Sequence, residues 1–364
     1  MAKIHGNDPT GYSYSAADTL KSASTALASS IGGQSGSRSS SVTTASTEFR
    51  GYFSEVFADN ADIGARSATK LVESLQSLSG FVQELRDAAK DEDDRRKQAK
   101  AWDARKRERE ENLLVAAGHE VSTWFGGGDD PKPPEPEPEP RLQAEEVSVK
   151  GREIPAGGGT SGGTSSAVPE DLRSFEANTR TLDSDLSSAV STFRNALSDY
   201  EAECNPCWGT LNAQSLLTAV NDWLTANGQD ADWAGTVAAQ FEAAGGGAGP
   251  ATLSDAAIAA ALSSAGIDAG RDDFTIGPFS AMGTPPTNGF ADDPVNTATG
   301  NFLEPETDLS FAGQAASLRL TRMYNSLDGR IGVFGLGWSS ILDIRLEVSD
   351  DVASVVLDDG RQVD

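Results

Sequence analysis

The chain has 364 residues and a formal net charge of −26 at pH 7. Such an acidic chain repels nucleic-acid phosphates and anionic lipids, so we expect no nucleic-acid partner. Only 38% of the residues are hydrophobic, beside 37 glycines and 16 prolines, which predicts that part of the chain is linker. No apolar run reaches the roughly 18 residues of a membrane span, and residues 1–9 lack the apolar core of a Sec-type signal peptide.

The N-terminal part has the apolar spacing of helices. A short helix is predicted over residues 15–30, with Ser15 and Asp18 at the spacing of a capping box. The Gly-, Ser- and Thr-rich stretch 32–47 should interrupt it.

A second helical tract begins at Phe49, and its apolar residues recur at steps of three and four as far as Leu85. Residues 86–112 then carry dense charges of both signs. This pattern favours a solvated helix held by pairs four residues apart, with a partner-binding surface as the alternative.

The composition changes over residues 126–168. A proline and glutamate run at 132–140 predicts a stiff spacer, and a glycine-rich run at 157–163 predicts a flexible one. Neither can bury enough apolar area to offset the cost of ordering the backbone, so we expect a linker.

The central block is predicted to be helical. Pro169 suits a first turn, and apolar residues mark one face as far as Tyr200. Shorter helices are expected over 213–226, 232–244 and 254–265.

After Phe274 the apolar period changes from helical to two. Strands are predicted over 342–348 and 352–357, and 358–361 has a hairpin signal. So small a sheet is marginal by itself and offers an edge to another strand. The predicted fold class is thus mainly α in the N-terminal and central modules, as helical hairpins or bundles, with a short, incomplete antiparallel β segment at the C-terminus.

Cys204 and Cys207 are the only cysteines, and they have the spacing of a thiol–disulfide redox motif. They follow the C-terminal end of a predicted long helix, where the dipole has the wrong sign to stabilise a thiolate. A structural disulfide or two reduced thiols in a tight turn is therefore expected. Zinc would need further ligands, and the only histidines, His5 and His119, are far away in sequence.

No catalytic constellation is evident. Residues 159–163 match the G-x-S-x-G nucleophile elbow, but they lie in the predicted linker rather than between a strand and a helix. We expect no enzyme activity and no cofactor in residues 1–364. Tyr14 and Asp18 fit the short Tyr-x-x-x-Asp pattern of type VII export signals. The alternative is that Asp18 caps the first helix and Tyr14 packs beside it.

Three motifs near the C-terminus carry a family resemblance. They are Asp-Pro-Val-Asn-Thr-Ala-Thr-Gly-Asn-Phe at 293–302, Thr-Arg-Met-Tyr-Asn-Ser at 321–326 and Phe-Gly-Leu-Gly-Trp at 334–338. Their order and spacing resemble the segment that leads into the repeats of Rhs (YD-repeat) proteins, whose β-shell encloses a C-terminal toxin. The lead-in positions are Asp293, Pro294, Asn296, Gly300, Asn301, Tyr324, Asn325, Gly335, Gly337 and Trp338.

The central block is similar to the module that precedes this segment in Rhs-type polymorphic toxins of actinobacteria, through residues 200–210, 230–246 and 253–257. Both helical blocks also resemble WXG-like proteins of type VII secretion, although Gly209 follows Trp208 directly. The likeness implies an export domain.

The resemblance implies a non-catalytic secretion and adaptor region, the front part of something longer. Its partners would be a secretion apparatus or export chaperone and the downstream shell and toxin, and it would be secreted or cell-surface by a leaderless route. A YD-repeat adhesion protein and, remotely, a thiol oxidoreductase are the alternatives. The expected domains are 1–125 (helical, export type), 126–168 (linker), 169–270 (central, helical), 271–289 (connector) and 290–364 (β-rich lead-in segment).

Overall fold

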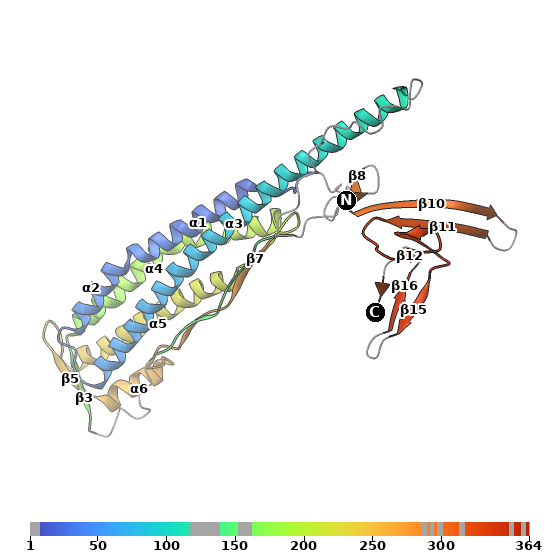
Figure 1. Cartoon of the computed structure of the whole chain (residues 1–364). Coiled ribbons are helices and arrows are strands. Elements are labelled where there is room, and N and C mark those ends of the chain that lie inside the picture. Colours follow the sequence, from blue (N-terminus) through green and yellow to red (C-terminus); the bar gives the residue numbers. More distant parts are fainter. Residues whose placement is uncertain are drawn as a thin grey trace. The chain divides into compact units, whose positions relative to one another are not determined.

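A computed structural model shows a mainly helical chain with small antiparallel sheets, as predicted (Figure 1). It divides into two compact units. The helical unit comprises Gly11–Ala89 and Pro140–Thr284, and the C-terminal unit comprises Met1–Thr10, Lys90–Glu139 and Pro285–Asp364. The described residues are 8–116, 139–151, 162–284, 290–291, 295–296, 301–312, 317–348, 353–357 and 362–363.

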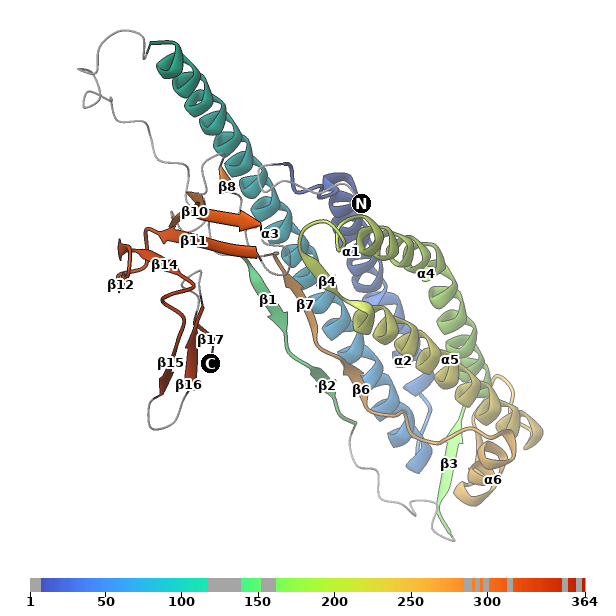
Figure 2. The same cartoon turned by 90° about the vertical axis from the view of Figure 1, so that its right-hand side faces the viewer.

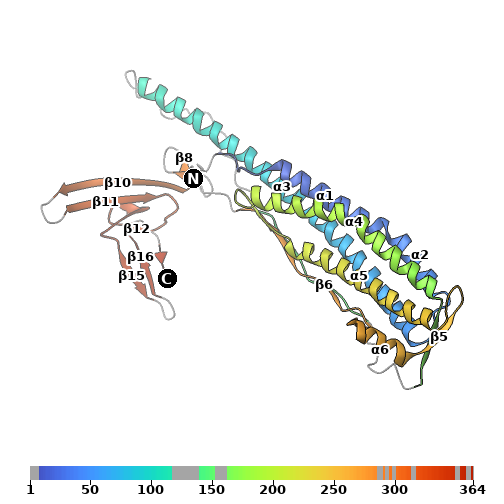
Figure 3. The ribbon, with the colours of Figure 1, turned by 180° about the vertical axis from the view of Figure 1, so that it is seen from behind.

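Long helices lie side by side in the helical unit, and α3 continues from it into the C-terminal unit (Figures 1 and 3). Two buried clusters form the core. One joins leucines of α1 and α3 to α4 and α5, and the other joins Phe53 and Phe57 to Trp233 and Phe241. The helices are α1 (Tyr14–Gly33), α2 (Ser35–Ser46), α3 (Tyr52–Ala116), α4 (Pro169–Glu203), α5 (Gln214–Ala243) and α6 (Asp255–Ala265).

The first helix begins two residues earlier than the expected capping box. The hydroxyl of Ser13 accepts a hydrogen bond from the backbone N–H of Ala16, so Ser13 is the N-cap and Ser15 is not. The predicted interruption at 32–47 was wrong, because only Gln34 separates α1 from α2. Tertiary packing overrides the weak helix propensity of the α2 residues, since α2 packs along α4.

Within its described residues, the helical unit also contains seven short strands. Strand β1 pairs with β7, and β2 pairs with β6, so the four strands form a ribbon along α3 and α5 (Figure 2). Strands β1 and β2 lie within the linker expected over 126–168, and strands β6 and β7 lie within the connector expected over 271–289. The strands are β1 (Arg141–Ala144), β2 (Val147–Val149), β3 (Thr164–Ala167), β4 (Thr210–Asn212), β5 (Ala251–Ser254), β6 (Phe274–Ile276) and β7 (Phe279–Met282).

The physical reason is long-range pairing. Val149 and Ala167 bury their side chains, and β3 pairs with β5 far along the chain. Such pairing leaves little trace in local composition, which proline and glycine dominate here. Most of the two spacer runs, at 117–138 and 152–161, lies outside the described residues.

Residues from the expected N-terminal and central domains share one core, so the structure does not separate 1–125 from 169–270. The two helices expected over 213–226 and 232–244 are one helix, α5. Gly228 lies inside it, between Asn227 and Asp230, whose side chains Arg271 binds.

Residues 86–112 are helical as predicted, within α3. The structure does not leave them uniformly solvated, because Glu92, Arg95 and Arg96 are buried. Glu92 accepts charge-assisted hydrogen bonds from Arg95 at 2.7 Å and from Arg96 at 2.6 Å. These two guanidinium groups lower the pKa of Glu92, although its burial acts in the opposite direction and is the largest single effect.

The remaining strands lie in the C-terminal unit. They form a five-stranded sheet of order β14-β11-β10-β9-β8, a β12-β13 hairpin and a three-stranded sheet β15-β16-β17. The strands are β8 (Phe290–Ala291), β9 (Val295–Asn296), β10 (Asn301–Ala312), β11 (Ser317–Asn325), β12 (Ile331–Gly332), β13 (Gly335–Leu336), β14 (Trp338–Ser340), β15 (Arg345–Val348), β16 (Ala353–Val356) and β17 (Gln362–Val363).

Candidate functional site

An aromatic cluster organises the lead-in segment. Tyr324 of β11 lies opposite Trp338 of β14, with their ring centroids 5.2 Å apart. Phe302 of β10 lies 5.9 Å from Tyr324. The Arg322 guanidinium lies 4.4 Å from the Trp338 ring and forms an ion pair with Asp308 at 3.2 Å. The structure thus brings Tyr324 and Trp338 together. It adds Arg322, which lies inside the 321–326 motif but is not one of the lead-in positions listed from the sequence.

The two motif glycines have separate conformational roles. Gly335 has a φ of 112° and follows the two-residue turn that joins β12 to β13. Gly337 has a φ of 75°, and a Cβ there would lie 2.8 Å from the carbonyl oxygen of Asn325 and 2.9 Å from the Tyr324 ring. The carbonyl of Gly337 accepts a 2.7 Å hydrogen bond from the Asn325 N–H. Both glycines of the Phe-Gly-Leu-Gly-Trp motif therefore have positive φ angles, which glycine adopts without strain.

The start of the lead-in motif is only partly described. Asn296 of β9 pairs in register with Asn301 of β10. Asp293, Pro294 and Gly300 lie outside the described residues.

Strand β10 offers an edge to another strand. One of its edges pairs with β11 from Leu303 to Ala312. Among the described residues, the other edge pairs only through Asn301 and Phe302, to β9. Unpaired backbone N–H and C=O groups along such an edge can accept a further strand.

The C-terminal unit also exposes apolar side chains. Leu346 lies opposite Val355 in the β15–β16 ladder, so both point to one face of that sheet, and both are exposed. Val348, on the same face of β15, is 71% exposed, and Ile331 in the neighbouring hairpin is 80% exposed. Val356, on the opposite face, is buried. This sheet therefore has an uncovered apolar face.

Tyr14 and Asp18 lie on the first turns of α1, joined by Arg86 of α3. Arg86 pairs with Asp18 at 2.9 Å, and its guanidinium lies 5.7 Å from the Tyr14 ring. Asp18 does not cap the helix, because Ser13 does. Both residues of the expected export pattern thus contact Arg86 within the helical unit.

The two cysteines are free thiols in a turn after α4. Cys204 is buried and donates a 3.4 Å hydrogen bond to the carbonyl oxygen of Ser13, whereas Cys207 is exposed. Burial raises the pKa of Cys204 to about 11. A redox-active cysteine needs a lowered pKa, so the environment of Cys204 opposes thiolate chemistry.

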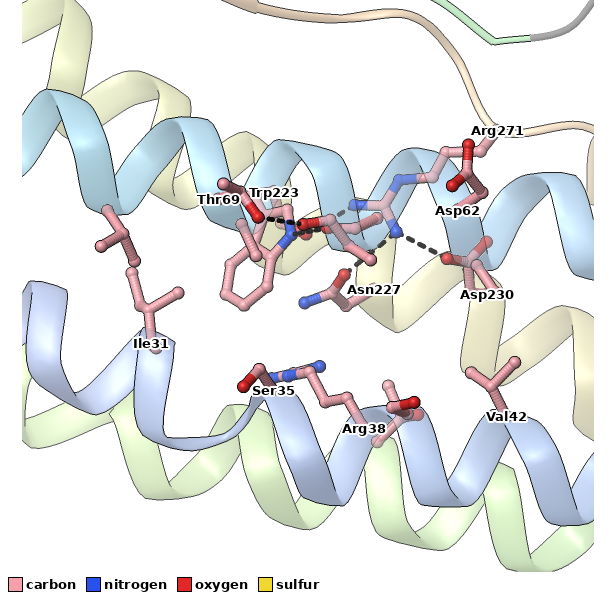
Figure 4. A pocket seen from close by; sticks show the side chains of 18 of the residues that line it. Ile31, Ser35, Arg38, Val42, Asp62, Thr69, Trp223, Asn227, Asp230 and Arg271 are labelled. Atoms are coloured by element: carbon pink, nitrogen blue, oxygen red, sulfur yellow. Dashed lines mark hydrogen bonds and ion pairs between the residues drawn. The ribbon is translucent and has the colours of Figure 1, made fainter.

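The helical unit contains a groove of about 680 Å³ between α2 and α3 (Figure 4). Its floor holds a polar network that the sequence did not reveal. Arg271 donates to Asp230 at 2.6 Å and to Asn227 at 3.0 Å, and Trp223 Nε1 donates to the Gly64 carbonyl at 3.0 Å. Burial raises the pKa of Asp230, against the opposing effect of Arg271.

A second arginine lies over the same floor. The Arg38 guanidinium lies 4.8 Å from the Trp223 ring and donates to Asp183 at 2.6 Å. The side chains of Arg38 and Trp223 therefore join α2 to α5 across the groove (Figure 4).

Within the part of the chain that the structure describes, no group of three His, Cys, Asp or Glu side chains could hold a metal ion. Over the same residues, no helix combines the length and apolarity that crossing a membrane requires.

Comparisons with known proteins relate the C-terminal part of the chain to others. Residues 292–364 match the family described as "Domain of unknown function (DUF6531)". A 65-residue stretch is 38% identical to the tRNA nuclease WapA of Bacillus subtilis (strain 168) and, equally, to the tRNA3(Ser)-specific nuclease WapA of Bacillus spizizenii. It covers 18% of this chain and 3% of each relative. No solved structure matches the chain significantly. The chain therefore contains a region related to WapA proteins.

Proposed function

We propose that this chain is a non-catalytic secretion and adaptor region of an Rhs-like secreted toxin. In this proposal the helical unit presents the protein to a type VII-like export system. The C-terminal strands begin a β-shell that encloses a toxin of the same polypeptide. The protein is then secreted or cell-surface by a leaderless route.

The uncovered apolar face of β15 and β16 is the observation that carries the proposal. Fully burying an aliphatic side chain contributes about 1.5–3 kcal/mol. Covering Leu346, Val348 and Val355 together would therefore lower the free energy by several kcal/mol. Further strands supply such a cover and also satisfy the open edge of β10. A shell built onto this segment meets both needs.

The relatives favour a toxin over an adhesive shaft. The matched WapA proteins are named as tRNA nucleases, and the separate match to the DUF6531 family covers residues 292–364, which include the open edge of β10. We place any nuclease or other toxin activity outside residues 1–364. The raised pKa of the Cys204 thiol supports a non-catalytic role for the Cys204–Cys207 pair.

Export through the helical unit is tested by removing that unit whole, because its two halves share a core. A variant without residues 11–284, carrying the same C-terminal epitope tag as the intact protein, should stay in the cells of the native host. The control is the tagged Ser77→Ala variant, which changes one exposed side chain of α3 and should be secreted normally. Secretion of the deletion variant at the level of the intact protein would refute the proposal.

A further inference from the structure

The groove between α2 and α3 has a volume of about 680 Å³ and is lined by residues of both helices. Where α1 faces α3, the two helices touch, and Ser24 Oγ donates a 2.6 Å hydrogen bond to the Leu75 carbonyl. Further along, α2 and the start of α3 diverge, and the floor of the groove comes from α4 and α5 (Figure 4).

The α3 wall has the spacing of a coiled-coil seam. Its small apolar residues are Ala58, Ala61, Ala65, Ala68 and Val72, at alternating steps of three and four. All five are exposed or half-buried. At a rise of about 1.5 Å per residue the seam is about 21 Å long, or about four helical turns.

The opposite wall repeats this spacing. Ile31, Ser35, Arg38 and Val42 face the groove from α1 and α2 at steps of four, three and four. Two facing seams with the same period select a helix as the occupant, because side chains of a third helix recur with that period. A β-strand, with its period of two, would not match either wall.

The floor adds a specific requirement. Arg38 uses Nε and Nη2 to bind Gln34 and Asp183, and its Nη1 has no hydrogen-bond partner among the described residues. Asp230 accepts from Arg271 through Oδ2 alone. Among the described residues, one donor and one acceptor therefore remain in a groove that the hydroxyl groups of Ser35, Ser39, Thr43 and Thr69 also line. An amide side chain supplies both complementary groups.

Charge decides between a second copy and another protein. The chain carries a net charge of −26, so two copies repel each other at long range. The exposed carboxylates of Asp62 and Glu73 at the rim of the α3 wall are paired with Arg66 and Lys70, so the net charge of the chain is the source of the attraction for a partner. A helix with basic residues outside its apolar face is attracted instead.

We infer that this groove binds an amphipathic helix of the export partner, with apolar residues at heptad spacing, one central Gln or Asn, and Lys or Arg on its flanks. The inference rests on the proposed function for the identity of the partner. The groove itself is tested separately from export.

The binding probe is a fluorescein-labelled synthetic helix of about four turns, with leucines at heptad positions, one central glutamine and lysines on the flanks. Fluorescence anisotropy is measured with the full chain and two variants, Ala65→Trp and Ser39→Trp, which fill the groove from either wall. Ser77→Trp adds the same side chain at an exposed α3 position outside the groove. Circular dichroism confirms that each variant is folded.

We expect saturable binding to the intact chain and to Ser77→Trp, and at least about tenfold weaker binding to both groove variants. A peptide of the same composition in scrambled order should not bind. No binding, equal binding of the scrambled peptide, or equal weakening by Ser77→Trp would overturn the groove as a helix site.

Secretion in the native host then tests the partner. Ala65→Trp should lower secretion severalfold, whereas Ser77→Trp should not. Normal secretion of Ala65→Trp, together with loss of secretion on deleting residues 11–284, would overturn the inference and leave the proposed function standing. Secretion of the deletion variant would instead overturn the proposed function.

Discussion

Replacing Arg271 with methionine should destabilise the helical unit strongly. The Arg271 side chain is 3% exposed and that of its partner Asp230 is 13% exposed, so the pair is largely removed from water. Methionine removes the charge and the hydrogen bonds to Asp230 and Asn227. Breaking a buried pair by removing one partner costs about 3–5 kcal/mol, because the remaining charge is left unpaired. We expect a loss of that size in the free energy of unfolding.

The double variant Arg271→Met, Asp230→Leu separates the charge effect from lost packing. Replacing both members of a buried pair by apolar residues is often neutral or stabilising. We therefore expect the double variant to recover most of the loss. Urea unfolding of the full chain, followed by far-ultraviolet circular dichroism and repeated on both single variants, completes the cycle.

The stability of Arg271→Met should also depend on pH. The pKa of Asp230 is already raised in the folded protein, and removal of Arg271 raises it further. The unfolded pKa of an Asp carboxyl is about 3.9. When the folded pKa is higher than this, the protonated carboxyl stabilises the folded protein at low pH, and this contribution is lost as pH rises through the folded pKa. The deficit of Arg271→Met should therefore shrink as pH falls from 7 towards 4. A loss below about 1 kcal/mol, or no recovery in the double variant, would refute this reasoning.

Three further changes test other parts of the structure. Ser13→Ala should lower the free energy of unfolding by about 1 kcal/mol, measured in urea, because the α1 cap is lost; an unchanged midpoint would mean that Ser13 is not the cap. Gly337→Ala should cost about 1–2 kcal/mol from its left-handed backbone, with more from the clash at Tyr324. Faster proteolysis of residues 301–340 would report this loss, and Gly329→Ala, where a Cβ meets nothing within 4 Å, is its control. Iodoacetamide at pH 8 should label Cys207 much faster than Cys204, whose pKa is about 11; equal labelling by mass spectrometry would contradict the buried thiol.

Strong periodicity was a reliable guide to the helices. The leucines from Leu71 to Leu85 lie on the buried face of α3, and Pro169 starts α4 as its position predicted. The lead-in positions Tyr324 and Trp338, named from the sequence motifs, contact each other in the structure. Each of these features depends on neighbours in sequence or on a spaced motif, which a single sequence displays directly.

Weak local signals failed where distant partners decide the structure. The residues of α2 have poor helix propensity, and the helix forms because it packs on α4. Strands β1 to β3 lie in a stretch whose composition indicated a linker. They form because they pair with β5, β6 and β7, which are more than 80 residues away in the sequence. No local pattern reports such partners.

The sequence by itself determined the acidity of the chain, its helical periods and the likeness of its C-terminal motifs to the segment that leads into a β-shell. These properties are local or additive along the chain. Only the tertiary structure joined the two expected helical domains in one core, buried Arg271 against Asp230 and opened the groove between α2 and α3. Those features exist only where residues far apart in sequence meet, and the free energies of burial and pairing decide where that happens.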